Sequence, residues 1–240
     1  MSHSDSSNTG VAQEGASPSV ATERKYQLII FDWDGTLVDS TRRIVDSMQQ
    51  AGRKVGLPAV PDEAVQDIIG LGLPEALRTV WPDITEAQLP LMREVYASYF
   101  VTDSQVTMGF FEGARALLDD LLAMDYQLAV ATGKSRKGLD RMLRDLAVGH
   151  LFEATRCADE TRSKPHPQML HELLSTLSIA PGEALIIGDT TYDLEMAARA
   201  GIDSVAMGHG AHDEQRLLAC GPQTICHSIS ELKRWITTHG

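Results

Sequence analysis

Residues 27–36 read Q-L-I-I-F-D-W-D-G-T, an unbroken apolar run that ends in two aspartates, Asp32 and Asp34. An apolar run without alternation is typical of a strand buried on both faces of a parallel sheet. In such sheets ligands bind beyond the carboxyl ends of the strands, which is where this pattern predicts both acids. Two carboxylates held this close repel each other unless a cation neutralises them, so the stretch predicts a cation site.

Further apolar runs and helical patterns alternate along the rest of the chain. The additional strand candidates are residues 128–131, 184–187, 204–207 and 224–226. Apolar residues recur every three or four positions in residues 139–146 and 169–177, and Gly201 is placed to end another helix. This alternation predicts an α/β fold with a doubly wound, mainly parallel, Rossmann-like sheet.

One block, residues 40–108, has helical patterns and no convincing strand. Ser40 is predicted to cap its first helix, and Thr85 and Gln88 form a capping-box pattern before another. The block is far longer than an ordinary connection, so we expect a separate all-helical domain inserted after the first strand. The expected division is a flexible tail at 1–24, a core at 25–39 and 109–240, and the insertion at 40–108.

Composition excludes several classes of function. The chain has 33 acidic and 21 basic residues, a net charge of −12 and no basic run longer than a pair, which argues against a nucleic-acid partner. No apolar run approaches the ~18 residues that span a bilayer, and the N-terminus lacks the apolar stretch of a secretion signal. Three cysteines without metal-binding spacing favour a reducing cytoplasm over a disulfide framework or a zinc site.

Three other segments carry polar residues at predicted strand ends or before a helix. Thr132 and Gly133 can offer a hydroxyl and a backbone amide to an anion, although a simple turn explains them as well. Lys164 precedes a proline-rich turn and, alone, would fit a solvated surface lysine. Asp189 and Asp193 repeat the pattern of acids after an apolar run, the second of them entering a helix.

The remaining conspicuous side chains fit structural roles. Trp33 is expected to pack behind the strand end, and Cys157 to be a small buried apolar group. His209 and His212, with Asp213, fit a glycine-flanked solvated loop better than a metal cluster.

Taken in order, these segments resemble the four motifs of the haloacid dehalogenase-like hydrolases. The matching residues are Asp32-x-Asp34-Gly35-Thr36, Thr132-Gly133, Lys164-Pro165 and Gly188-Asp189-x-x-x-Asp193. The resemblance covers the chain from Tyr26 to the C-terminus and includes the helical insertion, which is similar to that family's "cap" domain. The first and fourth motifs are specific, whereas the second and third add weight by their order.

The resemblance implies a role for each acid. Asp32 would attack phosphorus and form an aspartyl-phosphate, and Asp34 would act as general acid and base. A Mg²⁺ ion would be held by Asp32, the backbone carbonyl of Asp34 and Asp189. Asp193 would either join the metal shell or hold a metal-bound water. The phosphoryl oxygens would be bound by Thr132, the Gly133 amide and Lys164.

The implied activity is a Mg²⁺-dependent phosphomonoesterase for small phosphorylated metabolites. Asp34 argues against a carbon–halogen dehalogenase, and the loop at residues 70–77 resembles the phosphoglycolate phosphatase cap. Two alternatives stay open: a phosphomutase of the β-phosphoglucomutase type, and a noncatalytic phosphate-binding regulator. The expected partner is a small-molecule phosphate ester, with no nucleic acid or membrane, and both a monomer and a homodimer remain possible.

Overall fold

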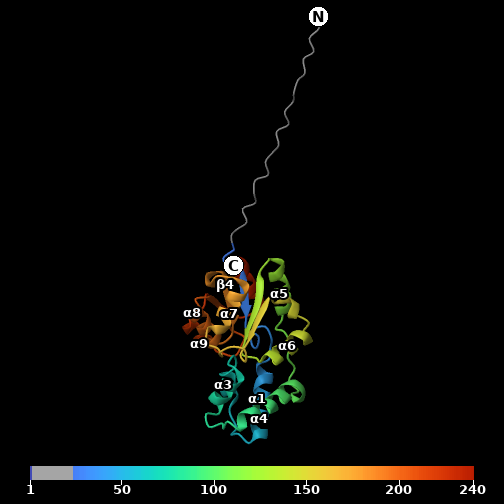
Figure 1. Ribbon diagram of the computed structural model, residues 1–240, viewed down its shortest axis with the longest axis vertical. Helices are drawn as coiled ribbons and strands as arrows, with labels where there is room; N and C mark the ends of the chain where they lie inside the picture. Colours follow the sequence, from blue (N-terminus) through green and yellow to red (C-terminus); the bar gives the residue numbers. More distant parts are fainter. Residues whose placement is uncertain (2–23) are drawn as a thin grey trace.

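A six-stranded sheet forms the centre of the computed structural model, which describes Met1 and residues 24–240 (Figure 1). The strands are β1 (Leu28–Phe31), β2 (Gln127–Thr132), β3 (Ala154–Cys157), β4 (Ala184–Gly188), β5 (Asp203–Met207) and β6 (Ile225–Cys226). They lie in the order β3-β2-β1-β4-β5-β6, and every neighbouring pair is parallel. This is the doubly wound α/β architecture that the alternating pattern predicts.

The strand order reverses at β1, which pairs with β2 on one side and β4 on the other. Phe31, the last residue of β1, is in register with Val130 and Ile187. The carboxyl ends of these three strands therefore meet at one edge of the sheet. In open α/β sheets this switch point is where ligands bind.

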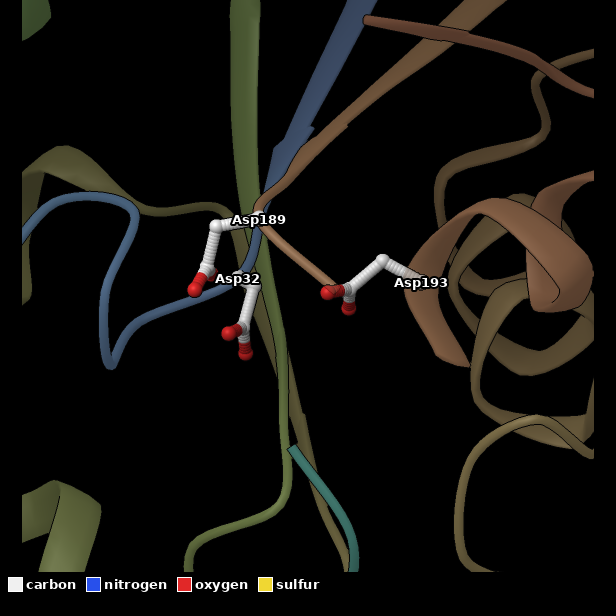
Figure 2. Close-up of side chains that lie close together, drawn as sticks. All are labelled: Asp32, Asp189 and Asp193. Carbon is white, nitrogen blue, oxygen red and sulfur yellow. The ribbon is translucent and has the colours of Figure 1, made fainter. Parts of the chain in front are cut away.

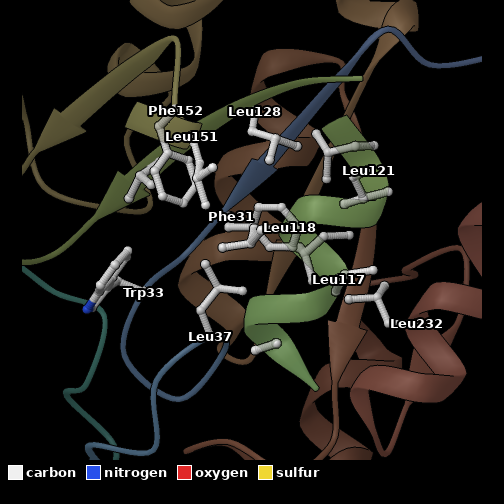
Figure 3. Close-up of a cluster of buried hydrophobic side chains, with 14 of the residues drawn as sticks. Phe31, Trp33, Leu37, Leu117, Leu118, Leu121, Leu128, Leu151, Phe152 and Leu232 are labelled. Carbon is white, nitrogen blue, oxygen red and sulfur yellow. The ribbon is translucent and has the colours of Figure 1, made fainter. Parts of the chain in front are cut away.

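Helices cover both faces of the sheet because alternate strand residues point to opposite sides. Ile29 and Phe31 pack under helices α5, α6 and α10, whereas Leu28 and Ile30 pack under α7 and α8 (Figure 3 shows the first of these clusters). The core helices are α5 (Ala114–Ala123), α6 (Arg136–Asp145), α7 (Gln168–Leu177), α8 (Thr191–Ala200), α9 (Glu214–Ala219) and α10 (Ile229–His239), with short 3-10 turns η2 (Gly149–Leu151) and η3 (Pro181–Glu183).

A second group of helices, inserted between β1 and α5, extends from one end of the sheet (Figure 1). Its members are α1 (Thr41–Val55), α2 (Asp62–Gln66), α3 (Leu73–Val80), α4 (Gln88–Ser98) and the π-helical turn η1 (Tyr99–Asp103). We call residues 41–103 the cap. The cap has its own apolar core, in which Met48, Leu77 and Met92 are almost fully buried. It is the all-helical insertion that the sequence predicts.

The two connections between core and cap run side by side. The Asp39 amide donates to the Gly109 carbonyl at 2.8 Å, and the Phe111 amide donates to the Leu37 carbonyl at 3.0 Å. Val38 and Phe110 form an antiparallel bridge between these bonds. The chain therefore leaves the core and returns to it at one place.

Two local predictions can be compared with the structure directly. The reciprocal capping bonds of Thr85 and Gln88 are present, from each backbone amide to the other's side-chain oxygen. Strand β3 was not predicted, because at this sheet edge only Cys157 is buried and Arg156 turns outward to pair with Glu172.

The predicted tail at residues 1–24 lies almost wholly outside the described residues. Within the described part of the chain, no helix is both long and apolar enough to cross a membrane.

Candidate active site

Three buried aspartates meet one buried lysine at the carboxyl edge of the sheet. Asp32 follows β1, Asp189 follows β4, and Asp193 lies in the first turn of α8, so their carboxylates converge (Figure 2). One oxygen from each lies within 4.8 Å of the others. The Lys164 ammonium donates to Asp32 Oδ1 and to Asp193 Oδ1, both at 2.6 Å.

The charges of this cluster do not balance. Burial, with the nearby charges of Asp193 and Asp189, raises the pKa of Asp32 despite Lys164. Burial and the charge of Asp193 raise the pKa of Asp189 to about 7. Burial opposes the charge on Lys164, yet Asp193 and Asp32 outweigh it and raise the pKa of the lysine. Asp32 Oδ2 is buried and has no hydrogen-bond partner among the residues that the structure describes. An all-oxygen cluster with excess negative charge fits a hard divalent cation such as Mg²⁺.

Asp189 is held rigidly by its surroundings. Its two oxygens accept hydrogen bonds from the Thr36 hydroxyl at 2.7 Å and the Ala211 amide at 2.8 Å. Gly35 has φ +81°, and a Cβ on either Gly35 or Gly210 would come within 2.2 Å of Asp189 Oδ2. The glycine of the first motif is therefore required both for the turn and for the close approach of this carboxylate.

Asp193 is fixed by the start of its own helix. Thr190 is the N-cap of α8, and its hydroxyl and amide donate to Asp193 Oδ2 at 2.7 and 3.2 Å. A Cβ on Gly188 would lie 2.4 Å from the Asp193 Cβ. This capping box leaves Asp193 Oδ1 facing Lys164.

Asp34 lies apart from this cluster, in the turn after β1. Its Oδ1 accepts a hydrogen bond from the Ser40 hydroxyl at 2.5 Å. The same oxygen forms an ion pair with the Lys134 ammonium at 3.0 Å. Ser40 is the N-cap residue of α1, as predicted, but its hydroxyl turns toward Asp34 and makes no capping bond among the described residues. The Ser40 carbonyl still accepts the Ile44 amide at 2.9 Å.

The residues of the second motif lie on the loop after β2. Thr132 is fully buried, and its hydroxyl accepts the Lys134 amide at 3.2 Å. Gly133 faces the cap: a Cβ there would lie 2.6 Å from the carbonyl oxygens of Gly70 and Leu71. The fold thus brings the residues of all four motifs to one sheet edge, directly beneath a cap loop.

A cavity of about 840 Å³ separates the cap from the core beside Asp34. Its cap wall includes Tyr96 and Phe100, and its core wall includes Lys134 and residues of α6. Burial, followed by the charge of Asp34, raises the pKa of Tyr96. The cavity therefore opens between the cap and the core next to Asp34.

A second contact joins cap and core at Asp67, and it overturns the prediction for His212. His212 is not solvated but buried: its Nδ1 accepts the Thr191 amide at 3.0 Å, so its Nε2 donates to the Asp67 carbonyl at 3.2 Å. The Tyr192 hydroxyl donates to the same carbonyl at 2.9 Å, and Arg216 pairs with the Asp67 carboxylate at 2.6 Å. A loop after β5 that looks solvated is thus a docking point for the cap.

Five residues make contacts at the site or at the cap that the sequence does not predict. They are Thr36, Ser40, Lys134, Thr190 and His212. Thr36 lies within the first motif and Lys134 directly follows the second. Their position next to predicted site residues in the sequence could have indicated that they belong to the site. Nothing in the sequence indicates that Ser40 contacts Asp34 or that His212 contacts the cap at Asp67. Trp33 and Cys157 are fully buried, as predicted.

A Rossmann-like sheet that presents Asp32, Asp34, Lys164 and Asp189 at its switch point beneath a helical cap defines the haloacid dehalogenase-like class of hydrolases. The model of the "Haloacid dehalogenase-like hydrolase" family matches residues 29–207, three quarters of the chain. The chain belongs to this family, and it is an enzyme of the phosphatase type.

Individual relatives within the family carry different names. It is 27% identical over 219 residues to the phosphoglycolate phosphatase of Vibrio parahaemolyticus, which covers 88% of this chain and 96% of that one. It is 33% identical over 187 residues to the tyrosine-protein kinase PtkA of Mycobacterium tuberculosis, covering 77% of this chain and 62% of that one. A crystal structure of a predicted phosphoglycolate phosphatase from Haemophilus somnus superimposes with a TM-score of 0.80 at 24% identity, covering 89% of this chain and 99% of that one, and supports the fold.

Proposed function

We propose that this enzyme is a Mg²⁺-dependent phosphomonoesterase that hydrolyses small phosphate esters through an aspartyl-phosphate on Asp32. The observation that carries the proposal is the environment of Asp32. Its Oδ1 is held by Lys164, whereas its buried Oδ2 has no hydrogen-bond partner in the described part of the chain and is free to attack phosphorus. The likeness to relatives named phosphoglycolate phosphatases supports the choice of small substrates.

The side chains of Asp32, Asp189 and Asp193 and the carbonyl of Asp34 would hold the Mg²⁺ ion. When bound, the ion neutralises the acids and draws negative charge from the phosphoryl group. Thr132, the Gly133 amide and Lys164 would bind the remaining phosphoryl oxygens, so that the transferring group is held by donors on several sides.

The reaction then follows from two carboxylates. Asp32 Oδ2 forms a bond to phosphorus as the bond to the leaving oxygen breaks, and Asp34 gives its proton to that oxygen. In the second half, Asp34 takes a proton from water, whose oxygen attacks phosphorus and releases Asp32. Inorganic phosphate and an alcohol are the products.

The position of the cap supports a division into a core at residues 25–39 and 109–240 and a cap domain at 40–108.

The three cysteines, Cys157, Cys220 and Cys226, are unpaired, and on that ground we place the enzyme in the cytoplasm.

The rival activities differ in the acceptor of the phosphoryl group. A phosphomutase would return it to a sugar phosphate, and a kinase-like transfer, suggested by the name of the mycobacterial relative, would place it on a tyrosine. A noncatalytic regulator would bind phosphate esters without turning them over.

The test is a panel of phosphate esters assayed with Mg²⁺ for released inorganic phosphate, together with acid-quench trapping of the phosphoenzyme. We expect release from small esters and a trapped phosphoryl group that is lost in Asp32→Asn. The matched control is Asp145→Asn, an exposed aspartate at the end of α6. Phosphate release by Asp32→Asn above about a tenth of the wild-type kcat would refute covalent catalysis through Asp32.

A further inference from the structure

Hydrogen bonds fix the backbone of Lys134, and its side chain points at Asp34. Its amide donates to the Thr132 hydroxyl at 3.2 Å, and its carbonyl accepts the Ala158 amide at 2.9 Å. The backbone is therefore fixed on both sides of the side chain. The ammonium reaches Asp34 Oδ1 at 3.0 Å, and each of the two side chains is only 11% exposed. A pair so sheltered from water differs from an exposed ion pair, which contributes little.

The two donors that contact the Asp34 carboxylate bind the same oxygen. Ser40 and Lys134 bond to Oδ1, and none of the described residues donates a hydrogen bond to Oδ2. Anchoring one oxygen from two directions sets the rotation of the carboxylate and leaves the other oxygen for the leaving group or water. A general acid needs this kind of alignment, because proton transfer requires hydrogen-bond reach to the reacting oxygen.

The cap covers Lys134 from the opposite side. The ammonium lies 4.5 Å from the centre of the Phe100 ring, and Phe100 packs against Tyr96 with ring centres 5.8 Å apart. Phe100 is itself 5% exposed. A cation over an aromatic face is attracted to it, most strongly when water is excluded. The aromatic pair therefore restricts Lys134 to the position in which it meets Asp34.

We propose that Lys134 is a positioning residue for Asp34, held in place by Phe100 of the cap, and that it aligns the carboxylate for both halves of the reaction. This inference rests on the proposed function of Asp34 as general acid and base. Lys134 acts through Asp34, because its ammonium pairs with that carboxylate and lies over the Phe100 ring.

The kinetic test compares wild-type enzyme with Lys134→Met, which keeps the length of the stem and removes the charge. With an alkyl phosphate, we expect kcat to fall about tenfold or more while KM changes less than about twofold. With p-nitrophenyl phosphate, whose leaving group needs no proton, phosphoenzyme formation measured by rapid quench should slow much less. Lys134→Arg should recover part of the loss.

Two further variants separate positioning from other roles. In an Asp34→Asn background, Lys134→Met should lower kcat no further, because the carboxylate that Lys134 aligns has been removed. Lys233→Met, which breaks a Lys–Asp pair with Asp120 away from the site, controls for the loss of a lysine. A rise in KM confined to anionic leaving groups would overturn the proposal and make Lys134 a substrate ligand. Equal slowing for both leaving groups, or full additivity with Asp34→Asn, would also overturn it.

A crystallographic comparison separates this inference from the proposed function. In crystals of Lys134→Met soaked with Mg²⁺ and beryllium fluoride, we expect the Asp34 carboxylate to rotate away from its wild-type orientation. This readout needs no turnover, so an inactive wild-type enzyme would refute the phosphatase proposal while the structures still decide the role of Lys134. An unchanged Asp34 orientation in the variant would refute that role.

Discussion

Gly133→Ala should separate the chemistry of the core from closure of the cap. Gly133 has no left-handed backbone angle, so alanine fits its conformation, and the substitution keeps the amide that we assign to phosphate binding. The new Cβ would lie 2.6 Å from the Gly70 and Leu71 oxygens, whereas ordinary contact begins at 3.4 Å, a shortfall of about 0.8 Å (3.4 − 2.6) against two backbone atoms. Overpacking of this kind costs about 1–3 kcal/mol, which would lower the population of the closed cap about 5- to 150-fold.

The assay is kcat/KM for an alkyl phosphate, measured beside amide hydrogen exchange of the loop at residues 67–72. We expect kcat/KM to fall by the same factor as loop protection, because only the closed cap excludes water and completes the site. Gly182→Ala is the control, since an added Cβ there meets no atom within 4 Å. Wild-type kcat/KM together with unchanged loop exchange in Gly133→Ala would show that the contact with the cap loop does not govern catalysis.

Four other outcomes test different parts of the site. Asp34→Asn should slow phosphoenzyme formation far more for alkyl phosphates than for p-nitrophenyl phosphate, and equal slowing by rapid quench would remove its role as an acid. Activity should require Mg²⁺ and be inhibited by Ca²⁺, which prefers more and longer oxygen contacts; full turnover after exhaustive chelation would contradict the metal assignment. In metal-free protein the raised pKa values of Asp32 and Asp189, the latter about 7, mean that the folded state binds more protons than the unfolded chain above about pH 4. Its melting temperature should therefore fall as the pH rises from about 4 to 7, and Mg²⁺ should remove this slope; calorimetry showing the opposite slope would refute the charge imbalance. His212→Ala should lower the free energy of unfolding by about 1–3 kcal/mol in urea titrations, because the Thr191 amide loses its partner and the Asp67 carbonyl of the cap loses one of its donors; unchanged stability would mean that the contacts of His212 are weak.

The sheet could be predicted because its central strands carry their signal locally. The run before Asp32 and the run before Asp189 are apolar on both faces, so each reads as a buried strand without knowledge of its neighbours. Strand β3 carries no such signal, since its position at the sheet edge leaves Arg156 and its neighbours partly exposed. The first and fourth motifs could be located for the same local reason, because each follows such a run, whereas the second and third gain weight only from their order in the family resemblance.

The contacts that orient the site could not be predicted in this way. Ser40 is an ordinary helix-capping residue by sequence, and only the return of the chain past Asp34 turns its hydroxyl elsewhere. His212 depends on Thr191 and on a cap carbonyl, groups that are 21 and 145 residues away. Backbone partners of this kind leave no mark on residue type. The cap therefore appears in the sequence as a block of helices, while its points of contact do not.

The paired connections at residues 37–39 and 109–111 make the cap exchangeable as a cassette. Because the Asp39 amide bonds to the Gly109 carbonyl, the two ends of the insert leave the core one hydrogen bond apart. A transplanted helical segment would need to span no gap and would leave β1 and α5 where they are. The N-terminal junction should follow Ser40, because the Ser40 hydroxyl donates to Asp34. The donor segment should carry an aromatic residue in the place of Phe100, which contacts Lys134. The donor segment would also have to keep the contacts of the cap with Gly133 and His212, and the exchange would then alter the cap wall of the cavity while leaving the buried acids of the core in place.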